Sequence, residues 1–352
     1  MGRSPLKTRS EGDVLVLVSI IIVNWNGRKH LATCLDSLAA QTFRDFEVIL
    51  VDNGSTDGSA AFVVESYPWV RLIPLTENSG FATGNNRGFV YAQGEYIVTL
   101  NNDTLSAPDW LATLAKVAGD HPRAGMVGSR ICSYDDPDLI DSIGVAICRD
   151  GMSRGQFRNR SWSSLRMGET EPILFPSACA ALYRRTMLEE TGFFDDDFFA
   201  YAEDTDLGLR GRLAGWEAVA ATGAVVLHKY SRSGGAFSPM KVYLVERNHY
   251  WVALKTFPLH LLLAVPLFTM VRYAEQLLAL LSGHGSGAEF MASSTRRGIA
   301  LALLRGARDG MGGIPRTLRK RCTVMNTRKI AMKEMSGLLS CYRLSFRNLL
   351  DR

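Results

Sequence analysis

The chain has 352 residues, of which 47% are hydrophobic and 21% charged, with a formal net charge of +5. This is the composition of a globular protein that buries a sizeable core, as one large domain with additions or as two domains. The six cysteines are scattered without a CxxC pair, which argues against a zinc site or a disulfide framework and fits a reducing cytosol.

The positive charge is concentrated at the C-terminal end. From Arg296 to Arg352 there are 14 Lys and Arg residues against 3 Asp and Glu, a local net charge of +11, which leaves about −6 for residues 1–295. A basic tail on an acidic body indicates an anionic partner, either a membrane surface or nucleic acid. Residues 1–13 are polar and charged and are predicted to be disordered, and the apolar run after them lacks the cleavage site of a signal peptide.

The first hundred residues alternate between apolar runs of strand length and segments with helical spacing. Strands are predicted over Val14–Val23, Phe46–Val51, Val70–Pro74 and Tyr96–Leu100, and helices over Arg28–Gln41, Ala60–Tyr67 and from within Glu77–Gly88 to Ala92. This alternation predicts an α/β fold with an open, mostly parallel sheet flanked by helices. The glycines at 80, 84 and 88 do not form GxGxxG, so a dinucleotide-binding fingerprint is absent.

The pattern continues less regularly to residue 238. Strands are predicted over Gly125–Ile131, Ala178–Tyr183 and Ala218–Leu227, helices over Pro108–Ala118 and Asp206–Ala214, and loops or a short hairpin over Ile143–Thr170. We therefore expect an α/β domain over residues 14–238, followed by a helical, basic, membrane-associating region over residues 239–352.

The C-terminal region contains an apolar block at Leu259–Met270, which Arg272 and Glu275 interrupt before Leu277–Leu281. A helix that crosses a bilayer needs about 20 apolar residues. The shorter block favours an interfacial or re-entrant helix over a full span, with a buried core helix as the alternative. The basic tail after it is suited to anionic lipid head groups.

Polar clusters follow several predicted strands, at Asn24–Gly27, Asp52–Ser59, Asn101–Asp103 and His228. In a parallel sheet these positions share one edge, so the clusters can converge on a crevice that binds a nucleotide. Asp52 can accept the imino N–H of a pyrimidine. Asp103 can hold a hard cation that neutralises a diphosphate, and His228 can complete that site. Taken singly, each also fits a turn, a turn cap or a structural histidine.

A second acidic cluster occupies residues 203–206, read as Glu-Asp-Thr-Asp. Neighbouring carboxylates raise one another's proton affinity, which suits a general base, and Asp204 is the candidate. The alternative is an acidic helix start that the helix dipole favours.

Five segments together resemble the inverting nucleotide-sugar glycosyltransferases of glycosyltransferase family 2, which have the GT-A fold. They are residues 18–27 (VSIIIVNWNG), 51–59 (VDNGSTDGS), 78–82 (NSGFA), 100–104 (LNNDT) and 203–207 (EDTDL). The subgroup they are most similar to is the rhamnosyltransferase-like one, which builds lipopolysaccharide O-antigens and cell-wall linkers.

The resemblance implies a role for each candidate residue. Asn24 and Asp52 would frame the base of a dTDP-sugar or UDP-sugar, and the donor pocket would also include Asn78, Gly80, Asn85 and Asn102. Asp103 would bind Mg²⁺ or Mn²⁺, with His228 as an added metal or diphosphate ligand, and Asp204 would deprotonate the acceptor. Two departures concern Asn101, where many relatives have an acid, and Pro176-Ser177-Ala178, where Gly-Ala is more usual.

The implied activity is transfer of a sugar, with rhamnose favoured, to a hydroxyl of a lipid-linked saccharide in cell-surface polysaccharide synthesis. The implied location is the cytoplasmic face of the cell membrane, as a peripheral protein without a nucleic-acid partner. Two alternatives are a sugar nucleotidylyltransferase and a non-catalytic membrane adaptor. The first needs a Gly-rich loop with Lys or Arg, which Asn24–Gly27 is not, and the acids Asp103 and Asp204 argue against the second.

Overall fold

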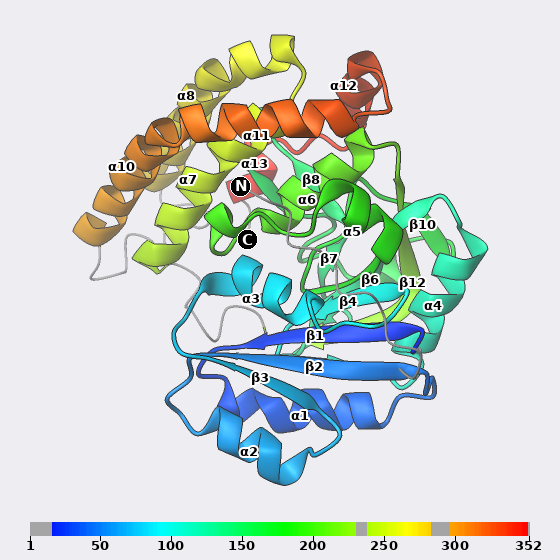
Figure 1. Cartoon of the computed structure of the whole chain (residues 1–352). Coiled ribbons are helices and arrows are strands. Elements are labelled where there is room, and N and C mark those ends of the chain that lie inside the picture. The colour runs from blue at the N-terminus through cyan, green and yellow to red at the C-terminus, as the bar shows by residue number, and fades with distance from the viewer. Residues whose placement is uncertain (1–15, 230–237, 283–295, 351–352) are drawn as a thin grey trace.

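The computed structural model describes residues 16–229, 238–282 and 296–350, and it centres on a ten-stranded sheet (Figure 1). Its path runs β10-β12-β6-β11-β4-β1-β2-β3, with β5 paired to β12 and β7 to β6. The strands are β1 (Val18–Asn24), β2 (Phe46–Asn53), β3 (Arg71–Leu75), β4 (Tyr96–Leu100), β5 (Thr104–Ser106), β6 (Ala124–Ser133), β7 (Ile140–Ile143), β10 (Thr170–Pro172), β11 (Ala180–Arg184) and β12 (Glu217–His228). A separate hairpin pairs β8 (Val145–Ile147) with β9 (Ser153–Gly155).

The strand directions bring the ends of distant strands to one edge. β1 is parallel to β2 and β4, and β12 is parallel to β6. β11 is antiparallel to both β4 and β6. Because β11 is antiparallel to both of its neighbours, β6 runs in the same direction as β4. β12 is parallel to β6, so it also runs in the direction of β4. The carboxyl ends of β1, β2, β4 and β12 therefore share an edge, as the predicted mostly parallel sheet requires.

Helices cover both faces of the sheet and continue into a C-terminal layer (Figure 1). They are α1 (Arg28–Ala39), α2 (Ser59–Ser66), α3 (Gly80–Phe89), α4 (Trp110–Asp120), α5 (Arg185–Thr191), α6 (Glu203–Leu213), α7 (Pro239–Thr256), α8 (Leu259–Ser282), α10 (Arg296–Gly312), α11 (Ile314–Thr327), α12 (Met332–Cys341) and α13 (Phe346–Leu350).

Two apolar clusters form the core, one on each face of the sheet. In β1, Ile20 and Ile22 pack with α1 and α4, whereas Ile21 packs with the helices of the opposite face. Side chains of a strand alternate between faces, so the apolar run of β1 reflects burial on both sides. The second cluster also includes Trp251 and Phe257 of the α7 region. The C-terminal helices therefore share a core with the α/β domain.

Most predicted elements are present, and two differ in a way that matters. The helix predicted from Asp206 begins at Glu203, so the whole acidic cluster lies in the first turn of α6. The apolar block of the C-terminal region is not interrupted, because α8 continues through Arg272. That side chain is 0% exposed and pairs with Asp150 (2.6 Å) and Glu246 (3.0 Å), so its charge is balanced inside the protein. The predicted disorder of residues 1–13 concerns residues outside the described part.

One helix in the described part of the chain is long and apolar enough to cross a membrane by length and composition alone. It is the Leu259–Leu278 portion of α8, whose mean hydropathy is 1.4.

Replacing Arg272 should destabilise the fold, because Arg272→Met leaves the carboxylates of Asp150 and Glu246 buried without their cation. Breaking a buried ion pair in this way costs about 3–5 kcal/mol, which urea unfolding followed by circular dichroism will measure. Lys116→Met is the matched control, since it removes an exposed ion pair with Asp120 and should have a negligible effect. Equal losses in the two variants would contradict a structural role for Arg272.

Candidate active site

Three polar clusters meet at the carboxyl edge of the sheet. Asn24 and Asp52 are partners in the β1–β2 register, and Asn24 Nδ2 donates to Asp52 Oδ1 at 3.1 Å. Asn102, which follows β4, donates from Nδ2 to Asn24 Oδ1 at 2.7 Å. Asp52 Oδ2 also accepts from the backbone N–H of Ser55 at 3.2 Å, so this side chain caps its turn as well as facing Asn24. The structure thus joins three residues that the sequence placed in separate loops.

Gly27 permits this close approach of the loops. A Cβ atom at this position would lie 2.1 Å from Nδ2 of Asn102 and 2.4 Å from Oδ1 of Asn24. Any side chain would therefore displace both amides, which explains glycine at the end of the Asn-Trp-Asn-Gly segment.

Asp103 and His228 lie together at the end of β4 and β12. His228 Nε2 is 3.3 Å from Asp103 Oδ1, and His228 Nδ1 is 2.9 Å from Asp141 Oδ2. An imidazole held by a carboxylate at one nitrogen, with the other nitrogen beside a second carboxylate, is a common arrangement for a metal ligand and its outer partner. Burial raises the pKa of Asp103, but the hydrogen bond and charge of His228 outweigh it and leave that pKa below its ordinary value.

These donors fit a divalent cation that also binds phosphate. Asp103 and His228 can each offer one atom to an ion, and Mg²⁺ or Mn²⁺ takes its remaining ligands from phosphate oxygens and water. The described residues hold no cluster of three or more His, Cys, Asp or Glu side chains suited to a metal. An ion held by Asp103 and His228 would therefore need further ligands, which the oxygens of a diphosphate could supply.

Asp204 reaches the same edge through the segment that precedes β11. Its Oδ2 accepts from the backbone N–H of Ala178 at 3.3 Å. The carbonyl of Ala178 in turn accepts from Thr99 of β4 at 2.8 Å, and the next carbonyl, of Cys179, accepts from the N–H of Asn101 at 2.8 Å. Ala178 and Cys179 thus connect the carboxylate of Asp204 to the end of β4. Asn101, which bonds to Cys179, is two residues before Asp103.

The loop that leads into α6 has an unusual backbone. Phe199, Tyr201 and Ala202 have φ values of 63°, 67° and 64°, which non-glycine residues adopt rarely and at a cost in energy. Asn248 of α7 holds this loop, because its Nδ2 donates to the carbonyls of Phe198 (3.1 Å), Ala200 (2.9 Å) and Tyr201 (2.7 Å). The conformation that presents Asp204 therefore depends on a residue of the C-terminal region.

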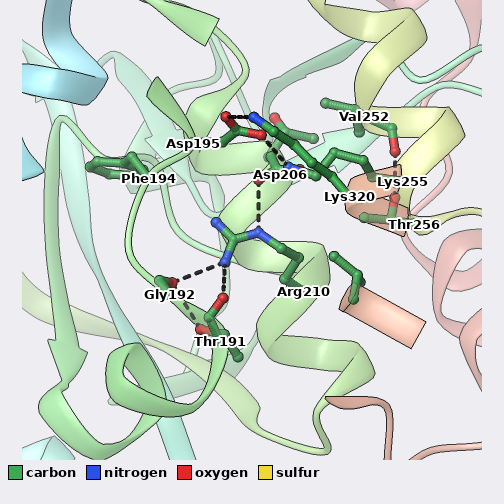
Figure 2. Close-up of polar contacts among 12 residues, drawn as sticks. Thr191, Gly192, Phe194, Asp195, Asp206, Arg210, Val252, Lys255, Thr256 and Lys320 are labelled. Carbon is green, nitrogen blue, oxygen red and sulfur yellow. Dashed lines mark hydrogen bonds and ion pairs between the residues drawn. The ribbon is translucent and has the colours of Figure 1, made fainter. Parts of the chain in front are cut away.

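A network of buried charges lies beneath the start of α6 (Figure 2). Asp206 is 0% exposed and pairs with Arg210 Nε at 2.8 Å and with Lys255 Nζ at 2.7 Å. Lys255 also pairs with Asp195 at 2.8 Å, and Lys320 of α11 contacts the same carboxylate at 2.5 Å. Asp206 is thus enclosed by cations, which makes it a poor candidate for a base and leaves Glu203 and Asp204 to be compared.

The remaining predicted donor residues are held in or near α3. Asn53 Nδ2 donates to Asn78 Oδ1 at 3.0 Å and to the carbonyl of Gly80 at 3.1 Å. Gly80 has a φ of 86°, and a Cβ atom there would lie 2.5 Å from the carbonyl oxygen of Phe199. Asn85 is 1% exposed and donates to the carbonyl of Phe81 within its own helix. These contacts order the strand-to-helix connection, and donor binding by the three residues stays a prediction.

Three further residues of this region, Asp141, Asn248 and Lys255, have no signal in the sequence. Asp141 lies in β7, in a stretch without clear periodicity, and the other two lie on a helix far along the chain. Their roles follow from tertiary contacts, and a single sequence carries no signal for those contacts.

Glu203 and Asp204 are neighbours with different surroundings. Burial raises the pKa of Asp204, and the N–H groups of Ala178 and Thr205 oppose that rise by hydrogen bonding to the carboxylate. Burial and then the charge of Asp204 raise the pKa of Glu203 much further, and Glu203 Oε2 has no hydrogen-bond partner in the described residues. Asp204 is therefore the more readily ionised of the two carboxyl groups.

We predict that Glu203→Gln makes stability less sensitive to pH. The folded protein holds a proton on Glu203 that the unfolded chain releases above its ordinary pKa of 4.5, so the free energy of unfolding falls as pH rises. Glutamine has no such proton to lose. The melting temperature of the variant, relative to the unmodified protein, should rise steadily from pH 4.5 to 8. Glu65→Gln, at an exposed position on α2, should give a constant difference, and a constant difference for Glu203→Gln would contradict the prediction.

Comparisons with known proteins agree with this geometry. The sequence profile of glycosyl transferase family 2 matches residues 19–192. The N-acetylglucosaminyl-diphospho-decaprenol L-rhamnosyltransferase of Mycobacterium tuberculosis is 33% identical over an alignment of 239 residues that covers 62% of this chain and 78% of that protein.

Two solved structures share the fold. The mannosyltransferase PcManGT from Pyrobaculum calidifontis, in complex with GDP-Man and Mn²⁺, has a TM-score of 0.52 and 21% identity over 92% of this chain and 91% of its own. GalNAc-T7 with UDP, GalNAc and Mn²⁺ has a TM-score of 0.56 and 15% identity over 70% of this chain, which spans only 48% of that protein. With its GT-A-type sheet and its 33% identity to the mycobacterial enzyme, the chain belongs to glycosyltransferase family 2.

Proposed function

We propose that this protein transfers a sugar from a dTDP-sugar or UDP-sugar to a hydroxyl of a lipid-linked saccharide, with inversion at the anomeric carbon. Rhamnose is the favoured sugar, and the product serves cell-surface polysaccharide synthesis on the cytoplasmic face of the membrane. The observation that supports the proposal is the hydrogen-bonded connection, through Ala178 and Cys179, between the carboxylate of Asp204 and the end of β4, where Asp103 follows. The name of the mycobacterial relative supports both rhamnose and a lipid-linked acceptor.

The donor half of the site would hold the nucleotide across the ends of β1, β2 and β4. Asp52 and Asn24 would bind the pyrimidine, with Asn102 fixing the orientation of Asn24 at 2.7 Å. Asp103 and His228 would hold Mg²⁺ or Mn²⁺, and Asp141 would orient the imidazole. The cation, when bound, stabilises the charge that develops on the leaving diphosphate.

The acceptor half of the site would be organised by Asp204. As the acceptor oxygen forms its bond to the anomeric carbon, the bond from that carbon to the diphosphate breaks on the opposite face. The hydroxyl proton passes to the carboxylate of Asp204, which the N–H groups of Ala178 and Thr205 hold in place at 3.3 and 2.7 Å. A single displacement of this kind inverts the configuration.

Family membership favours glycosyl transfer over the two alternatives. A nucleotidylyltransferase would place a glycine-rich loop with Lys or Arg after the first strand, whereas Asn24 and Gly27 occupy that turn and contact Asn102. A non-catalytic adaptor gives no reason for Asp103, Asp204 and His228 to share one edge.

Asp204→Asn should abolish transfer while donor binding survives. The amide cannot accept the proton, so turnover should fall by about 10²–10⁴-fold, measured as release of nucleoside diphosphate with dTDP-rhamnose and a short-chain lipid-linked acceptor. The affinity for the donor, measured by thermal shift across a panel of nucleotide sugars, should change little because the ligand stabilises the native state as before. Full turnover by this variant would remove Asp204 as the base.

Asp103→Ala should lose both turnover and cation-dependent donor binding. Without this carboxylate, Mn²⁺ should no longer increase the thermal shift that the donor produces, and turnover should fall by a factor on the order of a thousand or more. EDTA should have the same effect on the unmodified protein. Asp120→Asn, at an exposed position on α4, is the control and should behave as the unmodified protein. A donor-induced shift in Asp103→Ala that still responds to Mn²⁺ would rule out the proposed cation site.

A further inference from the structure

The exposed face of α8 is apolar, whereas a surface helix of a water-soluble protein exposes polar side chains to solvent. The large exposed apolar side chains of α8 are Leu259, Leu263, Leu267, Met270, Val271, Leu277 and Leu278, each 40–74% exposed. Their spacing places them on one face of the helix. Between Leu259 and Leu278, no exposed position of α8 carries Asp, Glu, Lys or Arg.

Arg272 and Tyr273 of α8 face the protein instead, whereas His260 at its start is exposed and Glu275 is half-buried. Arg272 pairs with Asp150 and Glu246, and Tyr273 Oη donates to Glu246 at 2.5 Å. Earlier in the helix, Val265 is buried in the apolar cluster that also contains Trp251 and Phe257. α8 is thus attached along several turns. A helix that crossed the bilayer would carry these contacts into lipid, so the attachment fits a helix that lies along a surface.

A second helix contributes a basic stripe. The exposed positions of α10 include Arg297 and Arg305 together with Leu301 and Leu304. Arg308 is also exposed, and it pairs with Asp309 of the same helix at 2.8 Å. Arginines interleaved with leucines suit the boundary between acyl chains and anionic head groups. In Figure 1, α8 and α10 both lie in the helical layer, on the side of the molecule away from β1–β3.

We infer that α8 and α10 form a membrane-docking surface in which α8 lies in the plane of the bilayer, with its leucine face at the boundary of head groups and acyl chains. Anionic lipid balances the arginines of α10, whereas a second copy of the chain would present the same positive stripe. The inference builds on the membrane location proposed above. Vesicle binding measured without any sugar tests it separately from catalysis.

The first test is sedimentation of the full chain with vesicles of phosphatidylcholine, alone or with phosphatidylglycerol. The unmodified protein should bind the anionic vesicles more tightly, and binding should weaken with salt. Leu263→Glu/Leu267→Glu should reduce binding by about tenfold or more, with an unchanged melting temperature because both side chains point away from the protein. Turnover of a short-chain, water-soluble acceptor should also be unchanged.

The matched control is Val64→Glu/Val90→Glu, which places the same charges at positions 62% and 75% exposed in the α/β domain. This variant should bind vesicles as the unmodified protein does. Equal binding by the two double variants would overturn the inference, as would absence of binding by the unmodified protein. A dimer in solution that Leu263→Glu/Leu267→Glu dissociates, with no vesicle binding, would assign the surface to a second copy.

A depth measurement separates lying in the plane from crossing. With the exposed Cys322 and Cys341 replaced by serine, single cysteines at positions 259, 267 and 278 carry an environment-sensitive fluorophore. Lipids that carry a quencher at a known depth should report the same shallow depth for the fluorophore at all three positions. A deeper position for residue 267 than for the other two would show a crossing helix and overturn the inference.

Discussion

The balance of charge around Asp206 is the constraint on which the acceptor side of the site depends. This carboxylate is fully buried, two residues from Asp204 in the first turn of α6, and an unpaired charge there would cost several kcal/mol. Arg210 supplies one cation from the same helix, and Lys255 supplies the other from α7. α6 therefore cannot move relative to α7 without separating an ion pair. The position of Asp204 is fixed by a helix that begins after the α/β domain.

A single antiparallel strand explains how the donor and acceptor halves meet. β11 lies between β4 and β6 and runs against both, so it begins at the edge where β4 ends. The residues just before β11 are therefore at the site. Ala178 gives its N–H to Asp204 and its carbonyl to Thr99, so one peptide segment touches both the proposed base and the strand that carries Asp103. A wholly parallel sheet would have placed this segment at the opposite edge.

The sequence predicts which proposed donor-side residues share one edge of the sheet, but it does not indicate which residues support the loop that carries Asp204. Asn24, Asp52 and Asp103 each follow an apolar strand, and in a parallel sheet the geometry alone brings such positions together. Asp204 was a candidate because acids are clustered there. Asn248 and Lys255 gave no such signal, since they lie on a helix whose place over the sheet depends on packing. In the sequence, Arg272 interrupts an apolar block. Only the fold shows that the buried carboxylates of Asp150 and Glu246 balance its charge.

The contrast between Glu203 and Asp204 shows how one helical turn can give adjacent carboxylates different states. Asp204 accepts two backbone N–H groups, which stabilise its charged form despite burial. Glu203 is buried beside it with one oxygen that has no hydrogen-bond partner in the described residues, so its neutral form is favoured. A second charge at this position would repel both Asp204 and an incoming nucleoside diphosphate. In the proposed mechanism, a neutral Glu203 would leave one negative charge at the proposed base, and an anionic donor would approach a cation at Asp103 with less repulsion.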